Sequence, residues 1–118
     1  MKQDFRDLVV WRRAVAFVTE AYRATQSFPS EERFGLTSQL RRASVSIPTN
    51  IAEGQGRLTR GEFRQFLGHA KGSLCEVETQ LIIAQSLGYM SDPQPLLEKL
   101  HEVARLLNGL LNSLTTDN

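Results

Sequence analysis

Few side chains in this sequence have the types and spacing that catalysis or metal binding requires. Glu98 and His101 have the Glu-x-x-His spacing with which some helical bundles hold two metal ions, but such a site needs a second copy of the motif and two further carboxylates. Cys75 is the single cysteine, so it lacks an internal disulfide partner, and no cysteine-enzyme motif surrounds it. We therefore predict a protein that is not an enzyme and that carries no metal and no cofactor.

The segment Gly54-Gln55-Gly56-Arg57 has some of the glycines of a phosphate-binding loop. It lacks the Gly-Lys-Ser/Thr ending of such a loop, and no strand precedes it. Because the segment lies between two predicted helices, we interpret Gly54 and Gly56 as a helix exit, where glycine tolerates left-handed backbone conformations.

Positive charge is concentrated in the first part of the chain. Residues 1–72 contain twelve Lys or Arg and seven Asp or Glu, whereas residues 73–118 contain two and six, and the net charge of the whole chain is only +1. Several cations on one rigid helix face would suit contact with nucleic-acid phosphates. The candidate nucleic-acid-binding residues are Arg57, Arg60, Arg64 and Lys71, with Arg41 and Arg42. The alternative is a solvated face whose cations pair with Glu53, Glu62, Glu76 or Glu78.

The first of four helices is predicted from Asp4 or Phe5 to Gln26. Two apolar stripes run along it, one of Leu8, Trp11, Val15, Val18, Tyr22 and Thr25, and a second of Val10, Ala14, Phe17, Ala21 and Ala24. A helix that is apolar over so much of its circumference buries two sides. We therefore predict an oligomer interface centred on Trp11, Phe17 and Tyr22.

The second helix is predicted to start at Ser30, which is a good N-cap residue, and to kink at Pro48, which removes a backbone hydrogen bond. We expect Ser44, Thr49 or Asn50 to satisfy the carbonyl that Pro48 leaves free. Its core stripe is Leu36, Leu40, Ala43, Ile47 and Ile51. A charge network that joins Arg41 or Arg42 to Glu53 or Glu76, within or between subunits, is predicted to hold the second and third helices together.

The third helix has a clear predicted start. Thr59 and Glu62 have the spacing of a capping box, and Leu58 and Phe63 occupy the positions of a hydrophobic staple. Its core stripe is Phe63, Leu67, Ala70, Leu74, Val77, Leu81 and Ala84, and Gly88 is predicted to end it.

The fourth helix is predicted to begin at Asp92-Pro93, where a cap residue precedes a first-turn proline. Its core stripe is Leu96, Leu100, Val103, Leu107, Leu110 and Leu114. Because three connections are short, neighbouring helices should be antiparallel. We predict a single all-α domain over residues 1–118, an antiparallel up-down-up-down four-helix bundle with a proline-kinked second helix. The apolar runs are too short to span a bilayer, and the lone cysteine suits a reducing, cytoplasmic setting.

Three blocks of the sequence resemble a bacterial four-helix-bundle family, the proteins encoded in intervening sequences of the 23S ribosomal RNA gene. The blocks are Val10 to Ala14, Leu36 to Arg57, and Glu62 to Glu78. The middle block carries most of the resemblance, with Arg41-Arg42-Ala43, Ser46-Ile47-Pro48 and Asn50-Ile51-Ala52-Glu53-Gly54-x-Gly56-Arg57. The structural signature consists of Pro48, Asn50, Glu53, Gly54, Gly56 and Glu76.

The resemblance implies a homo-oligomer, a barrel-like pentamer. The family also resembles accessory proteins of diversity-generating retroelements, which use a basic barrel to contact nucleic acid and a reverse transcriptase. We therefore expect an oligomer that binds structured RNA or DNA through a basic face. The alternative is a scaffold that binds another protein and has no role with nucleic acid, because this chain is less basic than a retroelement-type binder should be.

Overall fold

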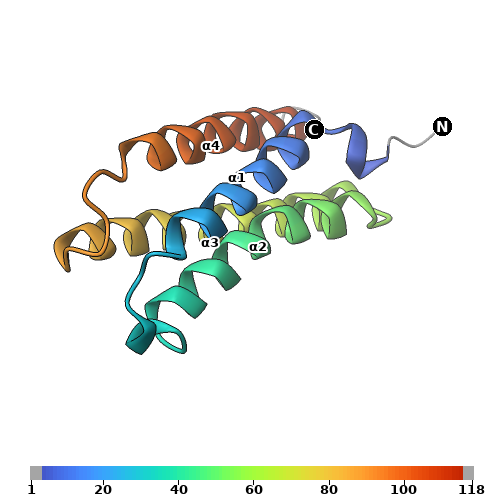
Figure 1. Cartoon of the computed structure of the whole chain (residues 1–118). Helices are drawn as coiled ribbons and strands as arrows, with labels where there is room; N and C mark the ends of the chain where they lie inside the picture. Colours follow the sequence, from blue (N-terminus) through green and yellow to red (C-terminus); the bar gives the residue numbers. More distant parts are fainter. Residues whose placement is uncertain (1–3, 116–118) are drawn as a thin grey trace.

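The structure is a computed structural model that describes residues 4–115. Within that range it contains helices and no β-strand (Figure 1). The elements are the 3-10 helices η1 (Phe5–Asp7) and η2 (Ser30–Glu32) and the α-helices α1 (Val9–Thr25), α2 (Leu36–Gln55), α3 (Arg60–Ser86) and α4 (Gln94–Thr115). The predicted all-α class with four main helices is confirmed.

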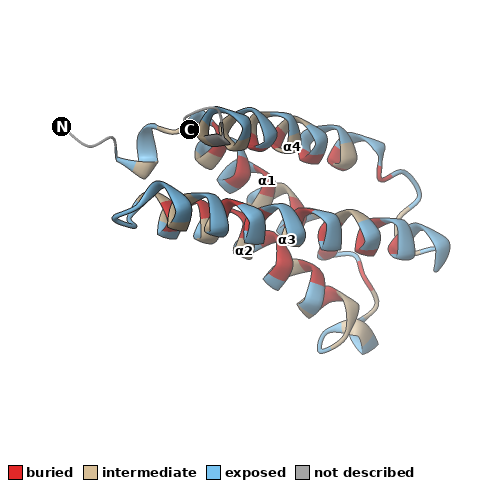
Figure 2. Cartoon of the chain, turned by 180° about the vertical axis from the view of Figure 1, so that it is seen from behind, coloured by how far each residue is buried: buried red, intermediate tan, exposed pale blue. Residues whose placement is uncertain are grey.

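The four α-helices pack as a closed ring of neighbours. Helix α1 contacts α2 and α4, and α3 contacts the same two helices. The molecule measures 47 × 21 × 20 Å, so its length is close to the roughly 40 Å of a helix of 27 residues such as α3. Buried residues face the middle of this ring along the helices (Figure 2). These contacts are those of a helical bundle with one core.

Helix α1 buries most of the second of its two predicted apolar stripes, together with Thr25 from the first. Its buried residues are Val10, Ala14, Phe17, Ala21 and Thr25. Val15 and Tyr22 are 37% and 41% exposed, whereas Phe17 is only 2% exposed. The alanines let α1 approach its neighbours, and Phe17 fills the space between them. The assignment of Phe17 to an outer interface is therefore wrong, because Phe17 belongs to the core of its own bundle.

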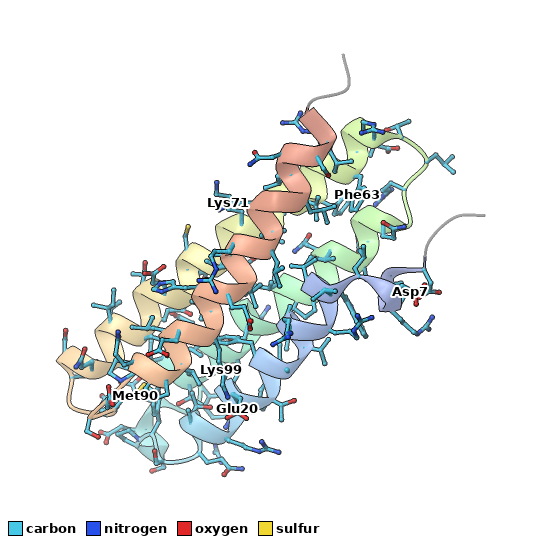
Figure 3. The ribbon with its side chains drawn as sticks, turned by 90° about the horizontal axis from the view of Figure 1, so that it is seen from above. Asp7, Glu20, Phe63, Lys71, Met90 and Lys99 are labelled. Atoms are coloured by element: carbon cyan, nitrogen blue, oxygen red, sulfur yellow. The ribbon has the colours of Figure 1, made fainter. Side chains whose placement is uncertain are left out.

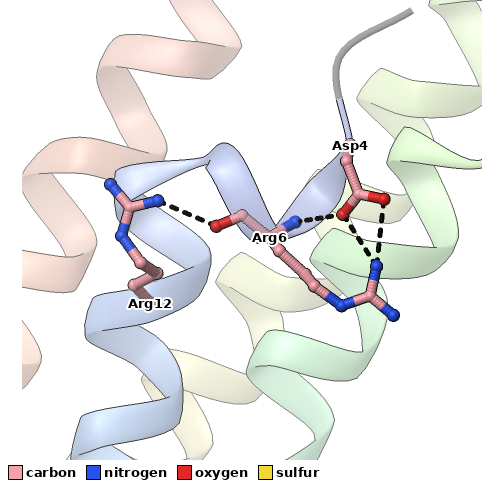
Figure 4. A network of polar contacts seen from close by, with 3 residues as sticks. All are labelled: Asp4, Arg6 and Arg12. Carbon is pink, nitrogen blue, oxygen red and sulfur yellow. Dashed lines mark hydrogen bonds and ion pairs between the residues drawn. The ribbon is translucent and has the colours of Figure 1, made fainter.

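The chain before α1 forms a separate turn rather than the first turn of the helix. The Asp4 carboxylate accepts a hydrogen bond from the Arg6 backbone N–H at 2.8 Å and two more from its guanidinium (Figure 4). Leu8 is extended, which separates η1 from α1. The Arg12 guanidinium donates to the Arg6 carbonyl at 2.8 Å and fastens this turn to α1.

Helix α2 starts at Leu36, six residues later than predicted, because Ser30 begins the short η2 instead. The N-cap residue of α2 is Gly35, and the Glu32 carboxylate accepts from the Leu36 backbone N–H at 3.0 Å and from the Tyr89 hydroxyl at 2.8 Å. Both hydrogen bonds lower the pKa of Glu32, and the bond from the Leu36 backbone N–H has the larger effect. The bond to Glu32 in turn raises the pKa of Tyr89. Glu32 therefore links the start of α2 to the segment that joins α3 and α4.

The core stripe of α2 is as predicted, and α2 continues through Pro48 as one element of 20 residues. Pro48 leaves the Ser44 carbonyl without its backbone donor, but the polar side chains around Pro48 donate to other carbonyls. Ser44 donates to Leu40, Thr49 to Val45 and Asn50 to Ser46, each at 2.8 Å. The expectation that they serve the Ser44 carbonyl is wrong, and the kink stays a prediction.

Helix α3 begins and ends as predicted. The Thr59 hydroxyl accepts the Glu62 backbone N–H at 3.1 Å and donates to the Glu62 carboxylate at the same distance. Leu58 is 95% exposed, so the predicted staple with Phe63 does not form. At the other end, Gly88 has a φ of +79°, and the backbone N–H groups of Gly88 and Tyr89 bond to carbonyls of the last turn of α3. This is the left-handed glycine stop that closes many helices.

Helix α4 completes the core with its predicted leucine and valine stripe. Leu96, Leu100, Val103 and Leu107 are buried, and the Asp92 carboxylate accepts the Gln94 backbone N–H at 3.1 Å. Among the described residues, none of the helices is long and apolar enough to cross a membrane.

Candidate nucleic-acid interface

The six candidate cations occupy three separate places, and the largest group lies along one edge of α3. Glu78 of α3 pairs with His101 of α4 at 3.1 Å, which identifies the edge of α3 beside α4. Lys71, Arg64 and Arg60 precede Glu78 by seven, fourteen and eighteen residues, so they lie on that same edge. All three are exposed, and Lys71 lies on the flank of α3 away from α2 (Figure 3). Helix periodicity thus places three of the six candidate cations on one edge.

Arg57 precedes Arg60 in the connection between α2 and α3, and its guanidinium lies on the α2 side of α3. Its guanidinium lies over the Phe66 ring, 4.5 Å from the centroid, and 3.8 Å from the Glu53 carboxylate. An arginine that stacks on a ring and pairs with a carboxylate keeps one orientation better than a solvated side chain does. Arg57 is therefore the best positioned cation of the group.

Gly54 explains how α2 delivers Arg57 to Phe66. A Cβ atom on Gly54 would lie 2.9 Å from the Phe63 ring and 2.9 Å from the Phe66 Cβ atom, which is closer than packed atoms approach. Neither Gly54 nor Gly56 has a positive φ. The interpretation of these glycines as left-handed exit positions is wrong, since Gly54 is required for the close contact between α2 and α3.

Arg41 fastens α2 to the end of α1 and lies apart from the α3 edge. Its Nε donates to the Thr25 hydroxyl at 2.8 Å, and its Nη2 donates to the Tyr22 carbonyl at 3.2 Å. The guanidinium also lies over the Tyr22 ring, 4.6 Å from the centroid. Within one chain, the predicted pairing of Arg41 with Glu53 or Glu76 is wrong, because α1 supplies its partners.

Arg42 lies in a shallow groove between α2 and α3, which also contains Phe34, Gln39 and Glu76. Across residues 4–115, neither Glu53 nor Glu76 forms an ion pair with Arg42. The groove floor is polar, because the Ser46 and Ser73 hydroxyls are 2.7 Å apart and Asn50 donates to Ser46 at 2.9 Å. The structure therefore gives the signature residue Asn50 a role in joining α2 to α3.

Sequence reasoning missed Phe34, which is 86% exposed. The Arg33 guanidinium lies 4.8 Å from the centre of its ring. The available signal was an aromatic residue outside every helical stripe, preceded by an arginine and followed by a glycine.

The side chains considered first for chemistry are exposed on α3 and α4. Glu98 and His101 lie on the exposed face of α4, where His101 bonds Glu78. Nearby, Arg13 pairs with Glu102. Lys99 of α4 pairs with Glu20 of α1 (Figure 3). Cys75 is exposed on α3. Within the described part of the chain, no three His, Cys, Asp or Glu side chains are placed to hold a metal ion.

The fold and its exposed cations define an all-α, four-helix protein with a cationic helix edge. Residues 6–109 match the family of 23S rRNA-intervening sequence proteins, and the chain belongs to this family. No curated protein matches the sequence.

Proposed function

We propose that this protein is a non-catalytic, cytoplasmic homo-oligomer that binds structured RNA or DNA through the α3 edge. The observation that carries the proposal is the alignment of Arg60, Arg64 and Lys71 on one rigid helix. Eleven residues separate the first from the last, which is about 16 Å of helix and about five base steps of duplex. Phosphate contacts of this kind carry no sequence information, so binding should tolerate many sequences.

The oligomer is proposed to be a pentamer of up-down-up-down bundles, each with a kink at Pro48. Support for self-association comes from α1, where Val15 and Tyr22 are each more than a third exposed on the same side of the helix as the half-buried Trp11. Trp11 packs edge-on against Phe5, with ring centres 5.1 Å apart, so this surface is already ordered. A net charge of +1 opposes assembly only weakly. Light scattering coupled to gel filtration tests this part, and a monomer at micromolar concentration would overturn it.

A gel-shift titration of a structured RNA and a DNA duplex at several salt concentrations tests the binding. The log of the affinity should fall with the log of the salt concentration by about 0.7 to 0.9 per phosphate contacted. An Arg60→Ala/Arg64→Ala double variant should reduce that slope by about 1.4 to 1.8, because two contacts are lost.

The matched control is an Arg13→Ala/Arg23→Ala double variant. It removes the same charge from exposed arginines of α1, the helix that does not contact α3, so it should keep the wild-type slope. Absence of binding at low salt, or equal slopes for the two double variants, would remove the α3 edge as the binding surface.

A scaffold that binds another protein is the second candidate function. It is favoured by large apolar side chains that are exposed at both ends of the bundle and on α3. These are Phe34, Leu58, Ile82, Ile83 and Leu87.

A further inference from the structure

We propose that the groove between α2 and α3 holds one unpaired nucleotide of the bound RNA, with its base stacked on Phe34 and its phosphate at Arg42. This inference rests on the proposed function and names the kind of RNA that the protein selects. The groove is an open depression of about 430 Å³.

Phe34 has the properties of a base-stacking platform. It is 86% exposed, so the Arg33 contact leaves most of the ring surface available to a ligand. An unpaired base stacks readily on an aromatic ring or an arginine, and Arg33-Phe34 offers both.

The backbone on both sides of Phe34 is held in place. The Gly35 N–H donates to the Glu32 carbonyl at 2.9 Å, and the Leu36 N–H donates to the Glu32 carboxylate at 3.0 Å. The Tyr89 hydroxyl, from the connection between α3 and α4, donates to that carboxylate at 2.8 Å. Because these bonds fix the turn, the ring is presented without the entropic cost of ordering a flexible loop.

The groove supplies partners for the rest of a nucleotide. Arg42 is exposed and has no hydrogen bond or ion pair with any residue in the described range 4–115, so its guanidinium is available for a phosphate. Gln39 is exposed and offers both an amide donor and an acceptor for the edge of a base. Glu76 adds a negative charge on the α3 side, where a carboxylate can accept from an amino group or a ribose hydroxyl but would repel a second phosphate. This arrangement suits one splayed-out nucleotide better than a continuous phosphate backbone.

The experiment compares an RNA hairpin that has an unpaired loop with a fully paired duplex of the same stem. Phe34→Ala should weaken hairpin binding roughly five- to 150-fold, the usual range for loss of one stacked base, and leave duplex binding unchanged. Phe34→Leu, which keeps an apolar side chain without a ring, should behave in the same way. Phe34→Trp should keep hairpin affinity, and the hairpin should quench its fluorescence more than that of the wild type, whose single tryptophan is Trp11.

Ile82→Ala is the matched control, because Ile82 is an exposed apolar residue of α3 outside the groove. Unchanged hairpin affinity in Phe34→Ala, alongside weakened binding of both RNAs by Arg60→Ala/Arg64→Ala, would overturn the stacking site and leave the proposed function intact. A smaller oligomer for Phe34→Ala in light scattering would show that a second copy of the chain covers the ring, which also overturns the site. Failure of the wild type to bind either RNA would overturn the stacking site, and it would overturn the proposed function as well if the DNA duplex also failed to bind.

Discussion

Replacing Gly54 with alanine tests the close contact between α2 and α3 that places Arg57 over Phe66. The added Cβ atom would lie 2.9 Å from Phe63 Cδ1, 2.9 Å from Phe66 Cβ and 3.2 Å from the Phe63 carbonyl oxygen. The Phe63 ring can rotate away. The Phe66 Cβ atom and the Phe63 carbonyl are fixed to the α3 backbone, so α3 itself has to move.

Two opposing effects determine the sign of the result. Alanine is favoured over glycine inside a helix by about 1 kcal/mol. Overpacking a filled contact costs about 1–3 kcal/mol, and the upper end applies where the obstructing atoms belong to the backbone frame. The net loss in the free energy of unfolding should therefore be about 2 kcal/mol. For a chain of 118 residues, each kcal/mol corresponds to about 4 °C, so Tm should fall by about 8 °C.

Thermal melts followed by circular dichroism measure this difference, with Gly72→Ala as the matched control. Gly72 is also inside a helix, but a Cβ atom there meets no atom within 4 Å. Gly72→Ala should raise Tm by about 4 °C from helix propensity alone. A Gly54→Ala variant as stable as the wild type, or a fall in Tm that Gly72→Ala shares, would refute the close contact.

Arg41→Ala should lower the free energy of unfolding, measured by urea titration, by about 2 kcal/mol, because two hydrogen bonds and a ring contact are lost. Arg42→Ala should change it by less than about 0.5 kcal/mol. Glu32→Gln should reduce the loss of stability at acidic pH, measured as the urea midpoint of unfolding at a series of pH values. The pKa of Glu32 is lowered in the folded protein, so its contribution is present above the ordinary value of 4.5 and is lost as the pH falls below it. The pKa of Tyr89 is raised, so the same hydrogen bond is lost at alkaline pH only as the pH rises through that raised value. A Glu32→Gln variant that loses stability at acidic pH as the wild type does would contradict this account.

The core of α2, α3 and α4 could be predicted from the sequence because each has a single stripe of large apolar residues. In α1 two such stripes lie side by side, and local spacing cannot tell which one meets the other helices. The choice depends on Phe17, whose ring fits between neighbouring helices that are distant in sequence. The start of α2 was placed too early because Ser30 and the glutamates after it suit a 3-10 turn as well as an α-helix.

Part of the candidate site could likewise be predicted from local spacing, and part could not. The alignment of Arg60, Arg64 and Lys71 depends only on helix geometry, so their spacing was sufficient. The environment of Arg41 depends on Tyr22 and Thr25, which come from another helix and include a backbone carbonyl that no sequence pattern marks.

Arg41 and Arg42 show why a sequence motif is not yet a site. Adjacent residues of a helix point about 100° apart, so the two arginines face different neighbours although they are consecutive. Arg41 reaches α1 and stabilises the fold, and Arg42 reaches the groove beside Phe34 and Glu76. A double replacement of both would combine a loss of stability with any loss of binding. Arg42→Ala alone leaves the contact between α1 and α2 intact, so its effect on RNA affinity measures the groove.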